Sequence, residues 1–295
     1  RASILRGLGR VILADFSDML FKPIFILCLL SICSLVSISL NSNDIIAIQC
    51  LAFVLVLIIS SFLLKKSFGG NQTVNNNMNT DVRRGFTKVT LVFLLISLCT
   101  VLQGQLPFYL TGYYLGNESA GYFQACILIV NVLAIGLSAV NSPIQPKIAA
   151  AWEKGDKNTV QHLITVSVRM ASIISFVFFI IIYFFSQYIL LMFGDNFIEA
   201  KSVLDILLVG QLINAFCGPC AMLLIMTKKQ SFVLYVFIAS IALGLSLGYW
   251  LVPLWGIEGS ALVSVIIMVF WNVIMAGYCY NKLSVITLPI IKLKS

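Results

Sequence analysis

The first residues that suggest chemistry are Cys217-Gly218-Pro219-Cys220, in the context NAFCGPCAML. Two cysteines separated by two residues have the spacing of thiol–disulfide oxidoreductases. That chemistry needs the first thiol at a helix N-terminus or near cations, which favour the reactive thiolate. Here the pair lies about three helical turns into an apolar segment that follows Asp205, and the next cation is Lys228. The surroundings therefore predict unreactive thiols and a bend at Gly218-Pro219.

Neutral polar side chains recur at helical spacing in three apolar segments. Gln124, Asn131 and Ser138 lie seven residues apart, and Gln211 lies three before Asn214. A third polar face holds Ser97, Thr100, Gln103, Gly104 and Thr111. Such side chains are costly in hydrocarbon and turn toward protein or water. They either form interhelical hydrogen bonds, worth about 0.6 kcal/mol each, or line a water-filled cavity. For the three faces together we favour the cavity, with Gln103, Gln124, Asn131, Ser138, Gln211 and Asn214 as substrate-binding candidates.

Two prolines lie within these apolar segments, each close to a glycine. Pro107 follows Gly104, and Pro219 follows Gly218. Proline removes a backbone hydrogen bond and kinks a helix. Two interpretations remain open: fixed kinks that improve packing, or hinges of a transporter that changes shape. Gly104, Pro107, Gly218 and Pro219 are the hinge candidates.

The composition defines the elements that must position these residues. The chain is 60% hydrophobic and 10% charged, with a mean hydropathy of +1.02, whereas soluble domains are about 45–50% apolar and about 25% charged. A helix crosses the bilayer core in about 20 residues. Eight charge-free segments reach that length: 23–43, 45–64, 89–117, 119–146, 170–194, 206–227, 230–257 and 259–281. We predict an all-α polytopic membrane protein with eight transmembrane helices.

The positive charges give the orientation. With eight crossings, 18 of the 19 Lys and Arg residues fall on one side, and only Lys201 falls on the other. Cytoplasmic loops carry the excess of Lys and Arg, so the cationic side and the C-terminus are predicted to be cytoplasmic. The basic balance is therefore a topology signal, and nucleic acid is not expected as a partner.

The remaining ionisable residues give no catalytic constellation. Arg169 lies at the inner end of the fifth predicted span, and the single histidine, His162, lies near its foot. The eight cysteines lie in or beside spans, where cysteine behaves as a small apolar residue. The loops hold no P-loop, dinucleotide fingerprint or zinc-ligand spacing. We expect no cofactor, no metal and no enzymatic activity.

Two further segments set the organisation. Residues 4–20 have an amphipathic helical pattern, which fits a helix on the inner membrane surface or a short soluble connector helix. Residues 65–88 form the longest polar loop, with a Gly- and Asn-rich centre. This loop is the predicted boundary between two helical bundles, with two spans before it and six after it. The chain starts at Arg1, and we expect it to lack its N-terminal helices.

Four stretches resemble one family of transporters. They are YYLGNESAGYFQACILIVN at 113–131, NSPIQPKIAAAWEKGDKNTVQHL at 141–163, FGDNFIEAKSVLDILLVGQLINAFCGP at 193–219 and GIEGSALVSVIIMVFWN at 256–272. In order and spacing they resemble the C-terminal half of the polysaccharide-biosynthesis flippases, the O-antigen (Wzx-type) exporters. That group belongs to the multidrug/oligosaccharidyl-lipid/polysaccharide exporter superfamily.

The resemblance implies a fold of two six-helix bundles. Residues 1–64 would hold the amphipathic segment and the last two helices of the first bundle, 65–88 the cytoplasmic loop, 89–281 the second bundle and 282–295 a cytoplasmic tail. It also implies a multi-pass protein of the bacterial inner membrane that flips undecaprenyl-pyrophosphate-linked oligosaccharide by alternating access. The implied partners are that substrate, membrane lipids and the polysaccharide polymerase machinery. The family cavity is often cationic, and Arg169 is the candidate here for contacting the pyrophosphate.

Two other functions compete with this hypothesis. A multidrug/cation antiporter of the same fold would place a carboxylate within the first bundle. The second competing function is a membrane enzyme. It would be either an enzyme of polysaccharide assembly or a thiol oxidoreductase that uses Cys217 and Cys220. A polymerase would show a large outer loop, and the longest outer loop here has about 17 residues.

Overall fold

The computed structural model describes residues 42–67 and 80–289. The predicted amphipathic helix at 4–20 and nearly all of the first predicted span, 23–43, lie outside the described residues. By its internal contacts the chain divides into two units, 1–78 and 79–295. The first unit contains α4, Ser42–Ser67, which coincides with the second predicted span. The bundle assignment of this unit stays a prediction.

The second unit crosses the membrane six times in four long helical stretches. α5, Thr80–Asn141, and α10, Gln230–Tyr278, are each long helices interrupted once. The apolar stretch within α5 has 53 residues and the one that contains α10 has 54, each about 80 Å long at 1.5 Å per residue. That length is two crossings of a core about 30 Å thick.

The two long helices fold back at glycines. α5 breaks at Gly116, with φ 87°, and α10 breaks at Gly256, with φ 59°. Both breaks lie where the sequence predicts an outer turn, and left-handed φ values favour glycine. The described chain is helical throughout its regular elements, as predicted for an all-α polytopic membrane protein.

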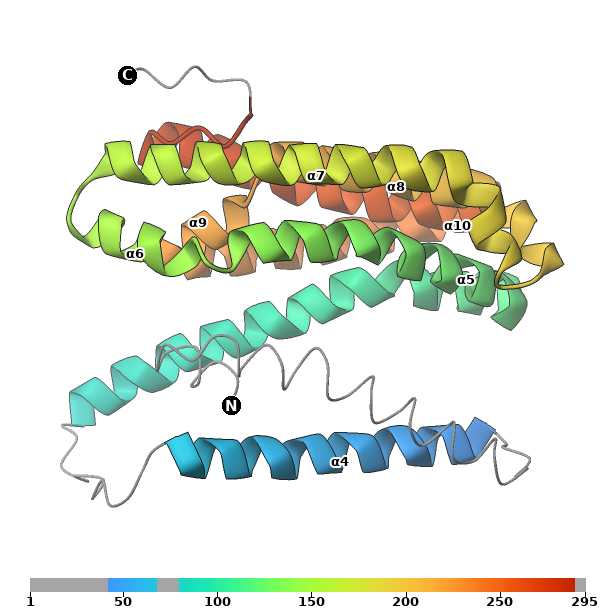
Figure 1. Ribbon diagram of the computed structural model, residues 1–295, viewed down its shortest axis with the longest axis horizontal. Coiled ribbons are helices and arrows are strands. Elements are labelled where there is room, and N and C mark those ends of the chain that lie inside the picture. The colour runs from blue at the N-terminus through green and yellow to red at the C-terminus, as the bar shows by residue number, and fades with distance from the viewer. Residues whose placement is uncertain (1–41, 68–79, 290–295) are drawn as a thin grey trace. The chain divides into compact units, whose positions relative to one another are not determined.

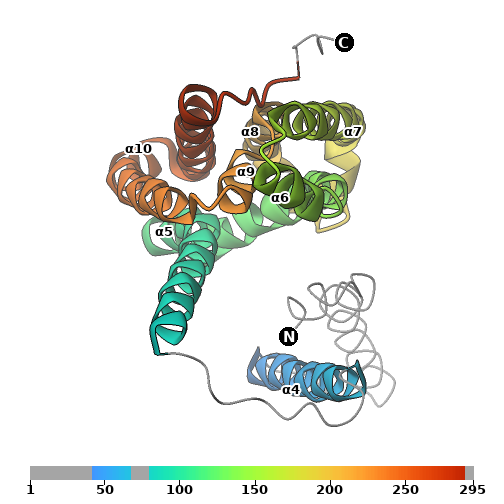
Figure 2. The same ribbon diagram turned by 90° about the vertical axis from the view of Figure 1, so that its left-hand side faces the viewer.

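The remaining spans are single crossings. α7 covers Lys157–Leu191, and the next span is built from η2, Asp195–Ala200, α8, Lys201–Cys217, and α9, Cys220–Met226. The short α6, Gln145–Glu153, connects α5 to α7. After α10 the chain continues through η3, Cys279–Leu283. Figure 2 looks along the helices from the end that holds α6 and α9.

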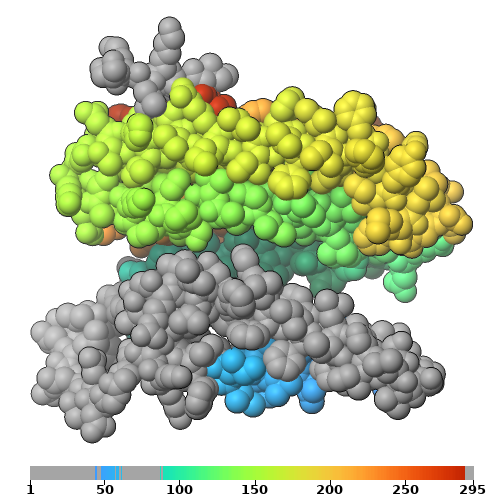
Figure 3. All heavy atoms as spheres, viewed as in Figure 1, coloured from blue at the N-terminus to red at the C-terminus, as the bar shows by residue number. Residues whose placement is uncertain are grey.

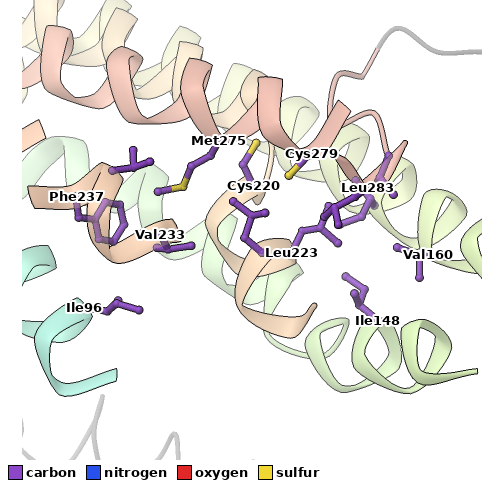
Figure 4. Close-up of a cluster of buried hydrophobic side chains, with 14 of the residues drawn as sticks. Ile96, Ile148, Val160, Cys220, Leu223, Val233, Phe237, Met275, Cys279 and Leu283 are labelled. Atoms are coloured by element: carbon purple, nitrogen blue, oxygen red, sulfur yellow. The ribbon is translucent and has the colours of Figure 1, made fainter. Parts of the chain in front are cut away.

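Two apolar clusters hold this unit together. One lies toward the α6 and α9 end and includes Ile148, Val160, Leu223, Val233 and Met275 (Figure 4). The other lies toward the opposite end, where α5, α7 and α8 meet, and includes Phe123, Leu133, Leu190, Leu204 and Leu208. The second cluster reaches the cavity described below, because its members Val130 and Leu207 also line that cavity.

Close helix approach depends on small residues. A Cβ on Gly210 of α8 would lie 2.5 Å from Cγ2 of Val265, and one on Gly248 of α10 would lie 2.3 Å from Cδ1 of Leu110. Lipid tails are as apolar as leucine, so close van der Waals packing is a main source of helix association in a membrane. The two glycines therefore fix how closely α8 and α5 approach α10.

The connectors at each end bring charged residues together. At the α6 and α9 end, Lys228 Nζ lies 3.2 Å from Glu153 Oε1. At the opposite end, a hollow of about 420 Å³ is lined by three carboxylates, Glu118, Glu199 and Glu258. The fold thus gathers residues that the predicted topology assigns to the same side.

Candidate functional site

A cavity of about 250 Å³ with a mixed apolar and polar lining lies among four spans of the second unit. Gln103 and Gly104 line it from the first arm of α5, Asn131 from the second arm, and Gln211 from α8. These residues come from three different polar faces of the sequence. The structure brings the three faces together around one hollow, which is completed by Thr100, Ile127, Val130, Leu207, Ser264, Ile267, Met268 and Trp271.

The cavity lies at the middle depth of the membrane. Gln103 is about midway between Val89, where the apolar stretch of α5 begins, and the break at Gly116. Asn131 has a similar position in the second arm, between Gly116 and Asn141. A central polar cavity walled by helices is the usual place for a transporter's substrate site.

One wall of the cavity is fixed by a hydrogen bond between helices. The Gln103 side chain donates from Nε2 to the carbonyl oxygen of Phe237 in α10, at 3.1 Å. Two hydroxyls of the lining donate to their own helices: Thr100 Oγ1 to the Ile96 carbonyl at 2.8 Å and Ser264 Oγ to the Ser260 carbonyl at 3.0 Å. The Gln103 contact locks the amide orientation before any ligand enters.

A second polar group adjoins the cavity at Gln211. Asn214, one turn further along α8, donates to Gln211 Oε1 over 3.5 Å and accepts from Asn272 Nδ2 at 2.8 Å. Asn272 is fully buried and also donates to the Met268 carbonyl at 3.0 Å. Within the described residues, Asn272 Oδ1 is one of two buried side-chain oxygens without a hydrogen-bond partner. The group thus links α8 to α10 and leaves one acceptor unpaired.

The other sequence-predicted candidates lie elsewhere. Gln124 is half-buried two turns from Asn131, and Ser138 is exposed two turns in the other direction. Neither lines the cavity. Arg169 lines a different hollow on α7, with Ser172, Phe176 and Pro289 among its neighbours. The structure therefore groups Gln103, Asn131, Gln211 and the adjoining Asn214, and separates the remaining three.

The last span contributes residues that sequence reasoning missed. Ser264 and Trp271 line the cavity, and Asn272 joins its polar group. One face of this span carries Ser260, Ser264 and Trp271, at spacings of four and seven residues. Helical spacing of this kind also places Gln124 and Asn131 on one face. The signal was present but was not followed into this span.

The four hinge candidates have two different local structures. α5 remains helical through Gly104 and Pro107. In contrast, α8 ends at Cys217 and α9 begins at Cys220, with Gly218 between them at φ 75° and ψ −176°. A Cβ on Gly218 would lie 2.5 Å from Val168 Cγ2 and 2.7 Å from the Thr287 carbonyl oxygen. Glycine is therefore required at this break for both conformation and space.

The Cys217–Cys220 pair lacks the geometry of a redox site. Cys217 ends α8, so the first cysteine is at a helix C-terminus rather than an N-terminus. Cys220 is fully buried, and its Sγ donates to the Cys217 carbonyl at 3.2 Å and lies 3.3 Å from Thr287 Oγ1. Both cysteines are free thiols. The two residues pack the break between α8 and α9.

The cavity has the chemistry of a binding site. Its described lining combines aliphatic side chains and one indole with three amides and two hydroxyls, and it holds no charged side chain. Across the described residues, no group of three or more His, Cys, Asp or Glu side chains is placed to hold a metal ion. Helices that span a membrane several times define the class of multi-pass membrane proteins, and the substrate sites of transporters lie near this depth.

The comparisons identify the family. The family model MatE matches residues 93–250, more than half of the chain. The chain belongs to the MatE family. No curated protein sequence gives a significant match.

Solved structures show the same fold. A structure titled as the outward-facing conformation of a multidrug resistance MATE family transporter of the MOP superfamily has a TM-score of 0.73 and 15% identity. Structures of MATE in complex with MaD5 and with MaL6 have TM-scores of 0.70 and 0.71, at 15% and 13% identity. Each covers 96% of this chain, whereas this chain covers 65%, 64% and 65% of theirs. The chain is therefore a multi-pass membrane protein with the fold of MATE transporters and about two thirds of their length.

Proposed function

We propose that this chain is part of a transporter that moves a lipid-linked oligosaccharide across the bacterial cytoplasmic membrane by alternating access. The observation that carries the proposal is the composition of the mid-depth cavity. The amides of Gln103, Asn131 and Gln211 each offer donors and an acceptor, as sugar hydroxyls require. Trp271 adds an aromatic face against which the C–H face of a sugar ring packs.

The lack of charged side chains in the described cavity lining supports a neutral substrate group. A charged ligand at this depth would need an opposite charge close by, because an unpaired ion is costly in the membrane core. None of the lining residues is charged. The sugar would therefore occupy the cavity, and the pyrophosphate would be held elsewhere in the transporter. The resemblance to polysaccharide-biosynthesis flippases points to the same substrate class.

The multidrug/cation antiporter remains the second candidate. The family match and the fold shared with a structure titled as a multidrug resistance transporter favour it. That function predicts a carboxylate within the first bundle, and the cavity of the second unit does not test this prediction. An enzyme of polysaccharide assembly has no corresponding observation in its favour.

One experiment distinguishes the two transport functions. A bacterial strain that lacks the gene is complemented with the wild-type protein or with Gln103→Leu and Gln211→Leu variants. Surface polysaccharide and drug susceptibility are measured on the same cells. The proposal expects the deletion to lose surface polysaccharide, the wild type to restore it, and the variants to restore it poorly. Unchanged polysaccharide together with increased drug susceptibility in the deletion strain would instead establish the antiporter.

A further inference from the structure

A second hollow, separate from the cavity that holds Gln103, lies on the surface of the second unit beside α7. It has a volume of about 450 Å³ and is walled by α7, the end of α8 and the segment after η3. Its lining is Arg169, Ser172, Ile173, Phe176, Val177, Phe216 and Pro289. α7 runs along the outside of the second unit in Figures 1 and 3. We call this hollow the α7 groove.

The wall of the α7 groove is apolar and exposed on the surface of the second unit. Ile173 is 66% exposed, Phe176 48% and Phe216 37%. In the most apolar part of α7 only 22% of the residues are buried. Exposed apolar side chains in a membrane-spanning helix contact acyl chains, because no water is present at that depth.

One end of the α7 groove carries a fixed positive charge. Arg169 lies 22 residues before the end of α7 at Leu191, which is about 33 Å along the helix. That distance matches the thickness of the hydrocarbon core, about 30 Å, so Arg169 lies at the level of the lipid headgroups. Its Nε donates to the Pro289 carbonyl oxygen at 3.2 Å, which holds the guanidinium at the groove.

We infer that the α7 groove binds a phospholipid with an anionic headgroup. The headgroup phosphate contacts the Arg169 guanidinium, and one acyl chain lies along Ile173, Phe176 and Val177 toward the membrane centre. Arg169 to Val177 spans about 12 Å, close to the roughly 15 Å of hydrocarbon in one leaflet. This inference does not depend on the proposed transport function.

Charge and geometry favour an anionic lipid over a zwitterionic one. Among the described residues that line the α7 groove, Arg169 carries the single charge, and its planar guanidinium matches phosphate oxygens. A zwitterionic headgroup adds a cation that the single arginine repels. The predicted topology also places this end of α7 on the cytoplasmic side, where anionic headgroups are attracted to basic residues.

The test compares retained lipids on the purified full chain. Dioleoyl phosphatidylglycerol and dioleoyl phosphatidylcholine are supplied in equal amounts, and bound lipid is measured by native mass spectrometry. We expect the wild type to retain phosphatidylglycerol about fivefold over phosphatidylcholine, as one headgroup-level cation allows. Arg169→Gln should reduce that preference to below about twofold, and Arg169→Lys should keep most of it. Lys157→Gln, which removes a cation outside the α7 groove, should leave it unchanged.

A second pair of variants tests the apolar wall without changing charge. Val177→Trp fills the α7 groove and should lower retention of phosphatidylglycerol about fivefold. Phe184→Trp, at a 73% exposed position of α7 outside the groove, should not. Equal phosphatidylglycerol preference in the wild type and Arg169→Gln would overturn the inference. So would full retention by Val177→Trp, or a loss in Lys157→Gln as large as that in Arg169→Gln.

Discussion

At the scale of single residues, the site depends on neutral side chains held in fixed orientations. Gln103 cannot rotate freely, because its amide nitrogen is bonded to the Phe237 carbonyl of another helix. Asn272 is held by two contacts from its own amide nitrogen while its oxygen remains unpaired. An unpaired buried oxygen costs about 1–3 kcal/mol, so a ligand or water that donates to it would recover that energy.

Gly104 gives a direct test of the cavity. It lines the hollow, and a Cβ placed there would have no neighbour within 4 Å. Gly104→Leu should therefore fill the cavity without straining the helix and should lower polysaccharide export about tenfold, equivalent to about 1.4 kcal/mol. The melting temperature should not fall, because leucine has a higher helix propensity than glycine. Surface polysaccharide and melting temperature are measured together.

The matched control for this variant is Gly277→Leu. Gly277 is also helical, lies away from the cavity, and would have no neighbour within 4 Å of an added Cβ. The Gly277→Leu variant gains the same helix propensity without filling the cavity. Equal export by Gly104→Leu and Gly277→Leu would show that the cavity does not bind the transported group.

Gly218→Ala tests the break between α8 and α9. The new Cβ would clash with Val168 and with the Thr287 carbonyl, and alanine is also strained at the positive φ of this position. The free energy of unfolding should therefore fall by about 3 kcal/mol. Gly155→Ala is the control, because Gly155 also has a positive φ, 73°, but open space around it. It should lose only about 1 kcal/mol. Thermal or denaturant unfolding compares the two, and equal losses would mean that the contacts at Gly218 relax freely.

At the scale of elements, the break in the α8–α9 span is covered by the extended chain after η3. Gln161 of α7 makes two hydrogen bonds to one residue of that chain: Nε2 donates to the Ile286 carbonyl and Oε1 accepts from the Ile286 N–H, both at 2.8 Å. The next residue, Thr287, contacts Cys220 beyond the break. Residues 284–289 thus tie α7 to the start of α9.

Replacing Gln161 should free this segment. Gln161→Leu removes both hydrogen bonds to Ile286 and leaves two partly buried backbone groups without these partners, at a cost of about 2 kcal/mol. Amide hydrogen exchange at Ile286 should accelerate while exchange in α10 stays unchanged. His162→Leu, at the exposed neighbouring position, is the control. Unchanged exchange at Ile286 in Gln161→Leu would show that other contacts hold the segment.

The N-terminus of α7 should respond to acid. Asp156 accepts from the Thr159 hydroxyl at 2.6 Å and from the Thr159 N–H at 3.0 Å. Both bonds lower the pKa of the Asp156 carboxyl, and the bond from the Thr159 hydroxyl contributes the larger part. The carboxylate therefore stabilises the folded state above the pKa of an unfolded Asp, and this contribution is lost as the pH falls through the lowered pKa. The difference in melting temperature between wild type and Asp156→Ala should shrink between pH 6 and pH 3 (about the range of Asp titration), and a constant difference would contradict the assignment.

Sequence patterns predicted the elements better than their contacts. Charge-free segments located the described spans and placed two boundaries between them at residues 118 and 258, close to the breaks at Gly116 and Gly256, because this signal is local along the chain. Polar spacing placed Gln103, Asn131 and Gln211 on helix faces but did not say which faces converge. Gln124 and Arg169 carry similar signals and lie outside the cavity, since convergence depends on helix packing over long sequence separations, such as the approach of α8 to α10 at Gly210.

At the scale of the whole molecule, the distribution of charge between the two ends matches the predicted topology. Lys228 and Lys229 lie at the turn between α9 and α10, and Glu258 lies just after the opposite turn at Gly256. The positive-inside rule assigns the lysine end to the cytoplasm. Because the two turns are joined by one membrane-spanning arm of α10, the orientation of the entire second unit can be read from two labelled positions.

Single cysteines at those positions test the orientation. Intact bacterial cells that express Lys229→Cys or Glu258→Cys are treated with a maleimide that cannot cross membranes. Glu258→Cys should be labelled in intact cells, whereas Lys229→Cys should be labelled only after the membrane is permeabilised. The unsubstituted chain is the control, because most of its described cysteines are buried in spans where the reactive thiolate is disfavoured. Labelling of Lys229→Cys from outside would reverse the topology, and would move Arg169 and the proposed phospholipid headgroup to the outer leaflet.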